Sequence, residues 1–374
     1  MPPEPSSLRT RPAPQPERRR RARYVAASAF AASIAIGLIA TLANPALVLA
    51  PEASFWDGEA ASAYQRALDE SSPLLGASRT VWGLVDFLAF GQGRAGVLVG
   101  SDGWLYSAEE YDVVGDPTAA VAAWSDAIIA VRDRLAGDGI ELVVALVPAK
   151  AAMVPGPSPA PLPEGARRRY DVALQALISA QVVAPDLRPV LAAAGRSGDV
   201  FLRTDTHWTP HGAEAAAVAI ASTIDEATGL SGLGSTPFAT EIVATEPLLG
   251  DLTSFLDLGP LAGRFGPAPD PLEIRRTVSL EGPGDDLFAE VRLSVALVGT
   301  SYSADARWNV AGALRDALGL DLHEAAITGF GPWEPMQRYL ASEAFASTPP
   351  EVIVWEIPER YLTLDGYVPG SAAP

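Results

Sequence analysis

Residues 291–303 read VRLSVALVGTSYS, and this stretch sets the fold class that the sequence predicts. It predicts a buried strand over 291–298, a turn of small residues, and then a helix over 305–319. This order places Ser301 at the carboxyl end of a strand, where open α/β sheets keep their sites. Its backbone N–H would lie near a helix N-terminus, where an oxyanion is stabilised. The string also suits a plain turn in which Ser301 or Ser303 caps the helix.

A second motif, RTDTHWT at residues 203–209, contains an imidazole and a carboxylate. Asp205 and His207 are two residues apart after an expected strand, and side chains so spaced point to the same side of an extended segment. A serine nucleophile needs an imidazole to take its proton and a carboxylate to fix the imidazole tautomer. We therefore expect Ser301 as nucleophile, His207 as base within about 4 Å of it, and Asp205 as orienter. A purely structural histidine is the alternative.

A zinc site is the rival interpretation of the same motif. His207 and His211 are four residues apart, and Asp205 could supply a third ligand. However, Pro210 is expected to begin the helix predicted over 210–227, which leaves His207 outside it. No acidic general base lies between the two histidines. The sequence therefore favours chemistry without a metal or another cofactor.

Alternating strands and helices predict an α/β fold with a mainly parallel sheet covered by helices on both faces. Between about 231 and 286 the alternation breaks into stretches dense in Gly and Pro, where we expect an inserted β-rich or irregular lobe. A strand, a turn and a second strand are expected over 97–106. The remaining expected strands are 140–147, 182–184, 199–203, 291–298 and 351–357, and the helices are 117–136, 164–180, 210–227, 305–319 and 333–344.

The N-terminal region predicts a membrane anchor. An arginine-rich tail over 1–23 precedes an uncharged run over 24–50, and a helix of about 20 residues crosses a ~30 Å hydrocarbon core. A positive flank keeps that end in the cytoplasm. We expect an uncleaved transmembrane signal anchor over 24–50, a helical connector over 51–96, and a catalytic domain over 97–374 in the periplasm, held at the inner membrane by a single pass. A cleaved signal peptide, with an apolar region of ~7–15 residues, is the alternative.

Composition excludes several classes of protein. The chain of 374 residues has no cysteine, which excludes disulfides and thiolate chemistry. Its net charge is −18 although the N-terminal tail is basic, so the rest of the chain is strongly acidic. Such a body repels nucleic acid, and we expect no nucleic-acid partner.

The two motifs together resemble the alginate O-acetyltransferase family, the AlgJ/AlgX-like proteins of the SGNH-hydrolase-like superfamily. The resemblance rests on Asp205-Thr206-His207-Trp208 followed by Gly299-Thr300-Ser301-Tyr302-Ser303. It implies a three-layer α/β/α core with the motif order permuted relative to ordinary SGNH hydrolases. Weaker supporting strings span about residues 97–361: Gly103-Trp104-Leu105-Tyr106, Val147-Pro148-Ala149-Lys150, Gly250-Asp251-Leu252 and Trp355-Glu356-Ile357-Pro358-Glu359-Arg360.

The resemblance also implies a reaction and its partners. Ser301 would carry an acetyl group to a hydroxyl of an exopolysaccharide, with His207 as base and Asp205 as its orienter. The acetyl group would arrive through a membrane-bound O-acyltransferase. A carbohydrate esterase with the same three residues, or a catalytically silent subunit of a polysaccharide export complex, stays open as an alternative.

Five further residues are candidates for substrate binding. Lys150, the only lysine, closes a predicted strand and either serves the site or extends to solvent along its apolar stem. Arg360 either binds substrate oxygens or pairs with Glu359 or a surface carboxylate. Tyr302 either donates to the oxyanion or packs, and Arg203 and Trp208 belong to the second motif.

Charge is the only clue to the acceptor glycan. The acidic body would repel a polyuronate over about a Debye length, ~10 Å at 0.1 M salt, which predicts a neutral or weakly charged acceptor. A local cleft lined by Arg203, Arg307 and Arg360 would reverse that prediction.

Overall fold

The computed structural model describes most of the chain, namely residues 16–43, 58–112, 117–230, 233–280, 293–364, 366–367 and 369. It divides into two compact units, Met1–Trp82 and Gly83–Pro374. The first contains α1 (Pro16–Leu42), α2 (Glu59–Ser71) and most of α3 (Pro73–Val85). A π-helical turn, η1 (Asp86–Phe90), follows α3. α2, α3 and η1 lie in the region where a helical connector was expected, residues 51–96, of which residues 51–57 lie outside the described ranges.

The predicted membrane anchor over 24–50 is wrong. Among the helices of the described ranges, none is both long enough and apolar enough to cross a membrane. The uncharged run was considered alone, but the helix that forms, α1, begins in an arginine run, and its uncharged part mixes Ala, Ser, Gly and Thr with larger apolar residues; charged residues are costly in the hydrocarbon core. Residues 44–50 of the expected span lie outside the described part. The predicted single-pass location in the inner membrane depended on this anchor and is therefore wrong as well.

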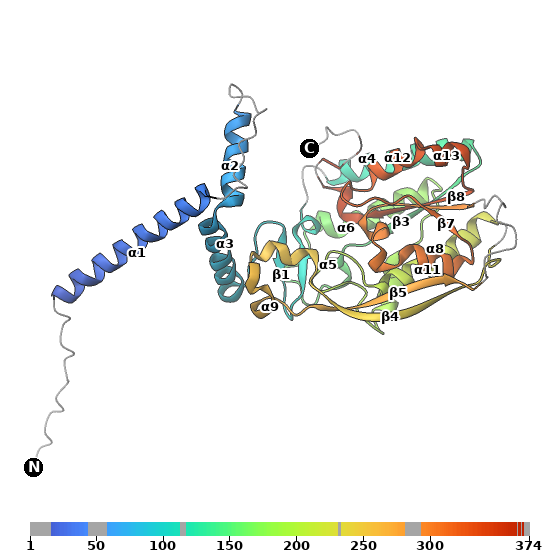
Figure 1. Cartoon of the computed structure of the whole chain (residues 1–374). Coiled ribbons are helices and arrows are strands. Elements are labelled where there is room, and N and C mark those ends of the chain that lie inside the picture. The colour runs from blue at the N-terminus through green and yellow to red at the C-terminus, as the bar shows by residue number, and fades with distance from the viewer. Residues whose placement is uncertain are drawn as a thin grey trace, which may run out of the picture. The chain divides into compact units, whose positions relative to one another are not determined.

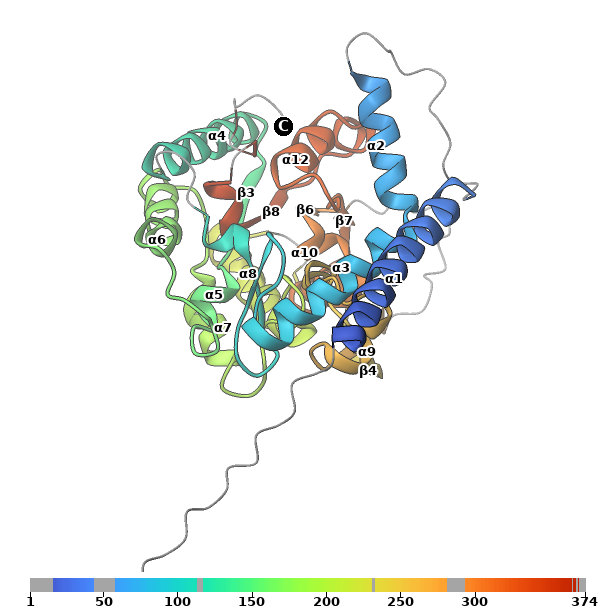
Figure 2. The same ribbon diagram turned by 90° about the vertical axis from the view of Figure 1, so that its left-hand side faces the viewer.

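A four-stranded parallel sheet forms the centre of the second unit. Its order is β3 (Glu141–Val147), β8 (Val352–Pro358), β6 (Val295–Val298) and β7 (Leu322–Glu324), and the labels follow one another from left to right in Figure 2. The first three strands are almost continuously apolar and buried, as parallel strands covered on both faces are. The predicted α/β class is confirmed.

Two hydrophobic layers cover the sheet because its side chains alternate between faces. Leu142, Val144 and Leu146 pack into one core, whereas Val143 and Val147 pack into the other. In Figure 1, α4 and α12 of the first core lie above the sheet, and α8 and α11 of the second lie below it. The first set is α4 (Pro117–Gly137), α6 (Glu164–Ser179) and α12 (Trp333–Leu340), and the second is α7 (Leu187–Ala194), α8 (Pro210–Thr228) and α11 (Val310–Leu318).

Several expected elements differ from those observed. No strand forms over 199–203, where a single bridge joins Phe201 and Trp208, and the strand expected at 182–184 is reduced to a bridge at Val183. His323, expected on a helix or connection, lies on β7.

The two C-terminal helices are interrupted. The helix expected over 305–319 is broken at Asn309, whose φ of 54° is left-handed. It consists of α10 (Ser301–Ala304), η5 (Ala306–Trp308) and α11. The helix expected over 333–344 ends at Leu340, and Ser342 caps the short α13 (Glu343–Ser347).

The region for which an inserted lobe was expected is a β-ribbon closed by short helices. Antiparallel strands β4 (Phe238–Leu248) and β5 (Asp270–Ser279) pair along their length. Between them lie η3 (Asp251–Leu256), η4 (Gly259–Leu261) and α9 (Ala262–Phe265). The first of these packs on the hairpin of β1 (Val97–Val99) and β2 (Leu105–Ser107) through Leu252 and Leu256. The remaining short elements are η2 (Ala108–Glu110), α5 (Lys150–Met153) and η6 (Glu359–Leu362).

Gly250, at the end of β4, brings this lobe against the segment that contains Asp205 and His207. A Cβ atom at position 250 would lie 2.4 Å from the backbone of Thr204 and 2.5 Å from Cβ of Asp205. A larger residue at position 250 would force one of these two segments to move. Steric contact therefore explains the glycine of the string Gly250-Asp251-Leu252.

We expect Gly250→Ala to lower the free energy of unfolding by about 1–3 kcal/mol, because the added methyl group overpacks against backbone. Urea denaturation measures the change. Gly263→Ala in α9 is the matched control, since nothing lies within 4 Å of a Cβ there. Equal effects of the two substitutions would contradict the steric account.

Candidate active site

Ser301 begins α10 directly after β6. The preceding Thr300 is the N-cap, and its Oγ1 accepts a hydrogen bond from the Tyr302 N–H at 3.3 Å. The Thr300 N–H donates to Oε2 of buried Glu356 at 2.7 Å. A Cβ at Gly299 would lie 2.5 Å from that oxygen, so the turn is tight. The Ser301 N–H donates to no protein acceptor within the described ranges.

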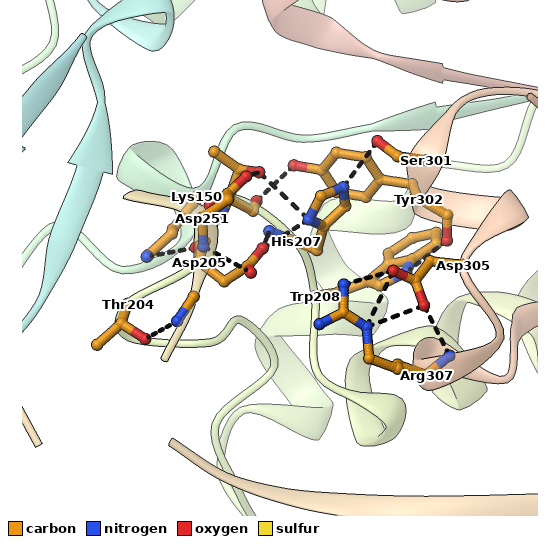
Figure 3. A network of polar contacts seen from close by, with 12 residues as sticks. Lys150, Thr204, Asp205, His207, Trp208, Asp251, Ser301, Tyr302, Asp305 and Arg307 are labelled. Carbon is orange, nitrogen blue, oxygen red and sulfur yellow. Dashed lines mark hydrogen bonds and ion pairs between the residues drawn. The ribbon is translucent and has the colours of Figure 1, made fainter. Parts of the chain in front are cut away.

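The side chains of Asp205, His207 and Ser301 form one hydrogen-bonded chain (Figure 3). His207 Nδ1 lies 2.6 Å from Asp205 Oδ1, and Nε2 lies 2.8 Å from Ser301 Oγ. The contact expected between Ser301 and His207 is therefore present. An ionised carboxylate can only accept, which assigns the proton to Nδ1 and leaves Nε2 to accept the serine O–H.

The Asp205 carboxylate is held ionised. Burial alone would raise its pKa, but the hydrogen bond and charge of His207, with backbone N–H donors, outweigh burial and lower the pKa of Asp205 to about 2. The backbone donors are the N–H groups of His207 and Asp251, each at 3.0 Å. The carboxylate therefore fixes the imidazole tautomer over the whole neutral range.

The His207 ring is fixed by aromatic neighbours as well. It stacks on Trp308 with 5.1 Å between ring centroids and lies 4.6 Å from the ring of Tyr302. Only 9% of the residue is exposed. One edge of the imidazole is left toward Ser301.

The Asp-His segment, residues 203–208, has no strand partner for most of its length. Side chains accept the hydrogen bonds of backbone N–H groups that a neighbouring strand would otherwise accept. Asp270 accepts from the backbone N–H of Arg203 at 2.7 Å and of Thr204 at 2.9 Å. Asp251 accepts from the N–H and the hydroxyl of Thr206 at 2.9 and 2.6 Å. These carboxylates satisfy buried donors that would otherwise lack partners. Neither role was predicted from the sequence, although Asp251 belongs to the string Gly250-Asp251-Leu252.

Lys150 and Trp208, expected to bind substrate, are instead fully buried. Lys150 neither extends to solvent nor faces an open site, because its Nζ donates to three backbone carbonyl oxygens. Trp208 Nε1 donates to the Tyr302 carbonyl at 3.1 Å. Both are corrected to structural positions beneath the site.

Tyr302 and Arg360 take the second of the alternatives that the sequence left open, packing for Tyr302 and an ion pair with a surface carboxylate for Arg360. The Tyr302 hydroxyl donates to the Thr206 carbonyl at 2.6 Å and accepts from Arg360 Nη1 at 3.0 Å. Arg360 forms its ion pair with Glu109 at 3.0 Å and not with Glu359. Both side chains are buried, with 2% of Tyr302 and 6% of Arg360 exposed.

Arg203 is the one expected binder whose side chain is half-exposed, and it pairs with Asp199 at 3.1 Å.

A metal is poorly accommodated by the residues present. Ligand atoms of Asp205, His207 and Asp251 lie within 4.8 Å of one another. Both His207 nitrogens and both Asp251 oxygens already serve the hydrogen bonds described above. His211 is not near this group and contacts Ser197 Oγ at 3.2 Å and the Ala194 carbonyl at 3.1 Å. The zinc pair considered from the sequence is not formed.

Comparison with known proteins identifies the family of this chain. A family described as "SGNH hydrolase-like domain, acetyltransferase AlgX" matches residues 97–359. The chain is 42% identical to the probable alginate O-acetylase AlgJ of Azotobacter vinelandii, over 82% of this chain and 80% of that protein. This chain belongs to that acetyltransferase family. The resemblance noted in its motifs is confirmed.

Solved structures of the AlgJ/AlgX family share the fold. The O-acetyltransferase domain of Pseudomonas putida AlgJ is 41% identical with a TM-score of 0.66, covering 72% of this chain and 93% of that one. Pseudomonas aeruginosa AlgX is 27% identical with a TM-score of 0.57, covering 70% and 62%. These similarities confirm the SGNH-hydrolase-like core.

Glu356, behind the serine turn, is a buried acid that the sequence analysis quoted without giving it a role. Desolvation raises its pKa to about 7, although hydrogen bonds from Thr300 oppose the rise. The sequence carried a signal, since Glu356 is the one charged residue in the otherwise apolar strand VIVWEIP.

The shifted pKa of Glu356 makes a prediction about stability. Between the unfolded pKa and about 7 the folded protein keeps a proton that the unfolded chain releases, so stability falls as pH rises through that window. Glu356→Gln keeps an acceptor and removes the titration. We expect it to abolish a loss of roughly 2–3 kcal/mol between about pH 4.5 and 7.5.

Urea denaturation at several pH values measures this loss. The exposed Glu246→Gln on β4 is the control and should keep the wild-type slope. Identical pH profiles for wild type and Glu356→Gln would show that the buried acid does not titrate as described.

Proposed function

We propose that this protein is a polysaccharide O-acetyltransferase that works through an acetyl-serine at Ser301. The observation that carries the proposal is the hydrogen-bonded chain from Asp205 through His207 to Ser301. Membership of the family supports acetyl transfer as the reaction. The hydrogen-bonded chain supports Ser301, His207 and Asp205 as the residues that would perform it.

In the first half-reaction Ser301 Oγ attacks the acetyl carbonyl carbon of the donor. His207 Nε2 takes the hydroxyl proton, and Asp205 stabilises the imidazolium without taking the proton itself. The tetrahedral oxyanion is stabilised by the Ser301 N–H, which donates to no other acceptor among the described residues. The donor group then leaves with the proton from His207, and the acetyl group is bound to Ser301.

In the second half-reaction a sugar hydroxyl is the nucleophile. His207 Nε2 takes its proton while its oxygen attacks the acetyl-serine carbonyl. When the second tetrahedral species collapses, the sugar ester forms and Ser301 recovers the proton from His207. The carbon–oxygen bond broken at Ser301 is replaced by the one formed at the sugar.

Donor and acceptor are proposed from the family. As the resemblance implies, the acetyl group would arrive through a membrane-bound O-acyltransferase and pass to an exopolysaccharide. The relatives are named alginate O-acetylases, and alginate is a polymer of uronates, which argues against the neutral acceptor predicted from net charge.

A local cation also supports a uronate acceptor. The half-exposed Arg307 side chain lies over the ring of Trp308, which stacks on His207. Its partner Asp305 neutralises part of the charge, at 2.6 Å. A cation at this position can meet a sugar carboxylate locally even though the chain as a whole is acidic.

The acceptor prediction is tested with neutral and uronate oligosaccharides over a range of salt. We expect faster transfer to uronates at low salt, with the preference fading as salt screens the attraction. Arg307→Gln should weaken the preference about 3–10-fold, as expected for one partly solvated charge contact, whereas the distant exposed Arg338→Gln should not. A neutral preference at every salt concentration would restore the prediction from net charge.

A carbohydrate esterase would use the same acyl-enzyme with water as acceptor. The two functions differ in products, so acetate and acetylated glycan are measured together. Acetate released at equal rates with and without glycan would favour the esterase, and absence of both products would favour a silent subunit.

Substitutions test the residues. Since the three side chains act as a unit, Ser301→Ala and His207→Ala should each reduce transfer by about 10³-fold or more, and the double variant should lose little further. The measurement is kcat/KM for acetyl transfer. Multiplicative losses would mean that His207 works elsewhere, and retained activity in Ser301→Ala would move the nucleophile to another residue.

A further inference from the structure

Lys150 is the only lysine of the chain and is completely buried. It begins α5 just after β3, and it lies beside Asp205 and Asp251 in Figure 3. Its Nζ donates to the carbonyl oxygens of Leu105 at 2.5 Å, Arg203 at 3.0 Å and Asp205 at 2.9 Å. Two of these three acceptors belong to the Asp-His segment.

Only a charged ammonium satisfies this arrangement. An ammonium group has three N–H donors and no acceptor, which matches three carbonyl oxygens. A neutral amine has two donors and a lone pair, so one of the three carbonyls would face that lone pair in place of a donor. The Arg203 carbonyl also accepts from the Leu105 N–H at 2.8 Å, so the loss would matter most at the other two carbonyls. The rings of Trp104 and Tyr106 lie 5.2 and 5.3 Å from Nζ and add cation–π attraction.

The charges around Lys150 come from several elements. Glu110 of η2 accepts from the backbone N–H groups of Lys150 and Ala151, at 3.0 and 2.8 Å. Asp205, Asp251 and Asp270 also favour the charged lysine, but burial outweighs all four carboxylates and lowers the pKa of Lys150 to about 8. The ammonium form of Lys150 is therefore only modestly favoured over the neutral amine at neutral pH.

A contribution to folding stability does not by itself explain why a buried lysine is present at this position. A buried cation costs desolvation, and replacing buried ionic groups by apolar ones is often neutral or stabilising. What the ammonium provides is geometry, because it joins β2 to the backbone of the residue that orients His207.

We propose that the Lys150 ammonium is a positioning residue for acetyl transfer, which fixes the Asp205 and Arg203 carbonyls and thereby holds the imidazole against Ser301. This inference rests on the proposed function. It follows that loss of the Lys150 proton loosens the Asp-His segment and reduces kcat, while the substrate-binding surface stays in place.

The first test uses the wild-type protein. Because there is one lysine, labelling with ¹³C-lysine gives a single side-chain NMR signal, whose titration reports Lys150 directly. We expect its midpoint at about pH 8 to coincide with the alkaline fall of kcat for acetyl transfer, with KM changing little. A kcat that stays constant through the lysine midpoint would overturn the proposal.

The second test uses variants. Lys150→Met keeps the length and removes all donors, and it should reduce kcat about 100-fold, whereas Lys150→Arg, which keeps the charge, should restore part of that loss. Arg169→Met is the matched control, since it removes a buried cation that pairs with Glu359 and donates to the Glu110 carbonyl and to Thr363, but to no atom of the Asp-His segment. It should lower stability and leave kcat within a few-fold.

These outcomes separate the two proposals. If wild type shows no acetyl transfer, the proposed function fails. If wild type is active and folded Lys150→Met keeps its kcat, or Arg169→Met loses as much, the positioning role fails alone. Should Lys150→Met not fold, the NMR titration of wild type still decides the question.

Discussion

A short length of mostly buried backbone with few strand contacts is the constraint on which this structure depends. Residues 204–208 are buried, and their N–H and C=O groups must be satisfied because buried peptide groups are costly to leave unpaired. Asp270 and Asp251 accept from the N–H groups, and Lys150 and Tyr302 donate to the carbonyls. Side chains thus perform the task of a sheet ladder.

These four side chains come from elements far apart in the chain, so the position of His207 depends on the whole second unit. Asp251 and Asp270 belong to the lobe of β4 and β5, Lys150 follows β3, and Tyr302 lies next to the serine. The lobe therefore contributes directly to the site, because its carboxylates hold the backbone that carries His207. Contacts of this kind make the effects of substitutions interdependent, because neighbouring partners share one network.

The sequence predicted residues that lie together in short motifs, but it did not predict features that depend on which way a side chain points. Asp205, His207 and Ser301 could be found because two short motifs place them at strand ends. Lys150, Arg360 and Trp208 were taken for substrate contacts because position along a strand does not tell whether a polar side chain turns inward. Asp270 carried no signal at all, since its partner segment is distant in the chain. The membrane anchor was wrong, because no helix of the described ranges is both long enough and apolar enough to cross a membrane.

The central claim is that Ser301 carries the acetyl group, and the most direct measurement is mass spectrometry of the protein quenched during turnover with an activated acetyl ester. The account predicts one added acetyl group on the peptide that contains Ser301. That peptide should lose the label when a glycan acceptor is supplied, and it should gain none in His207→Ala. Turnover with no label on Ser301, or a label on another residue that passes to the glycan at the rate of turnover, would contradict it.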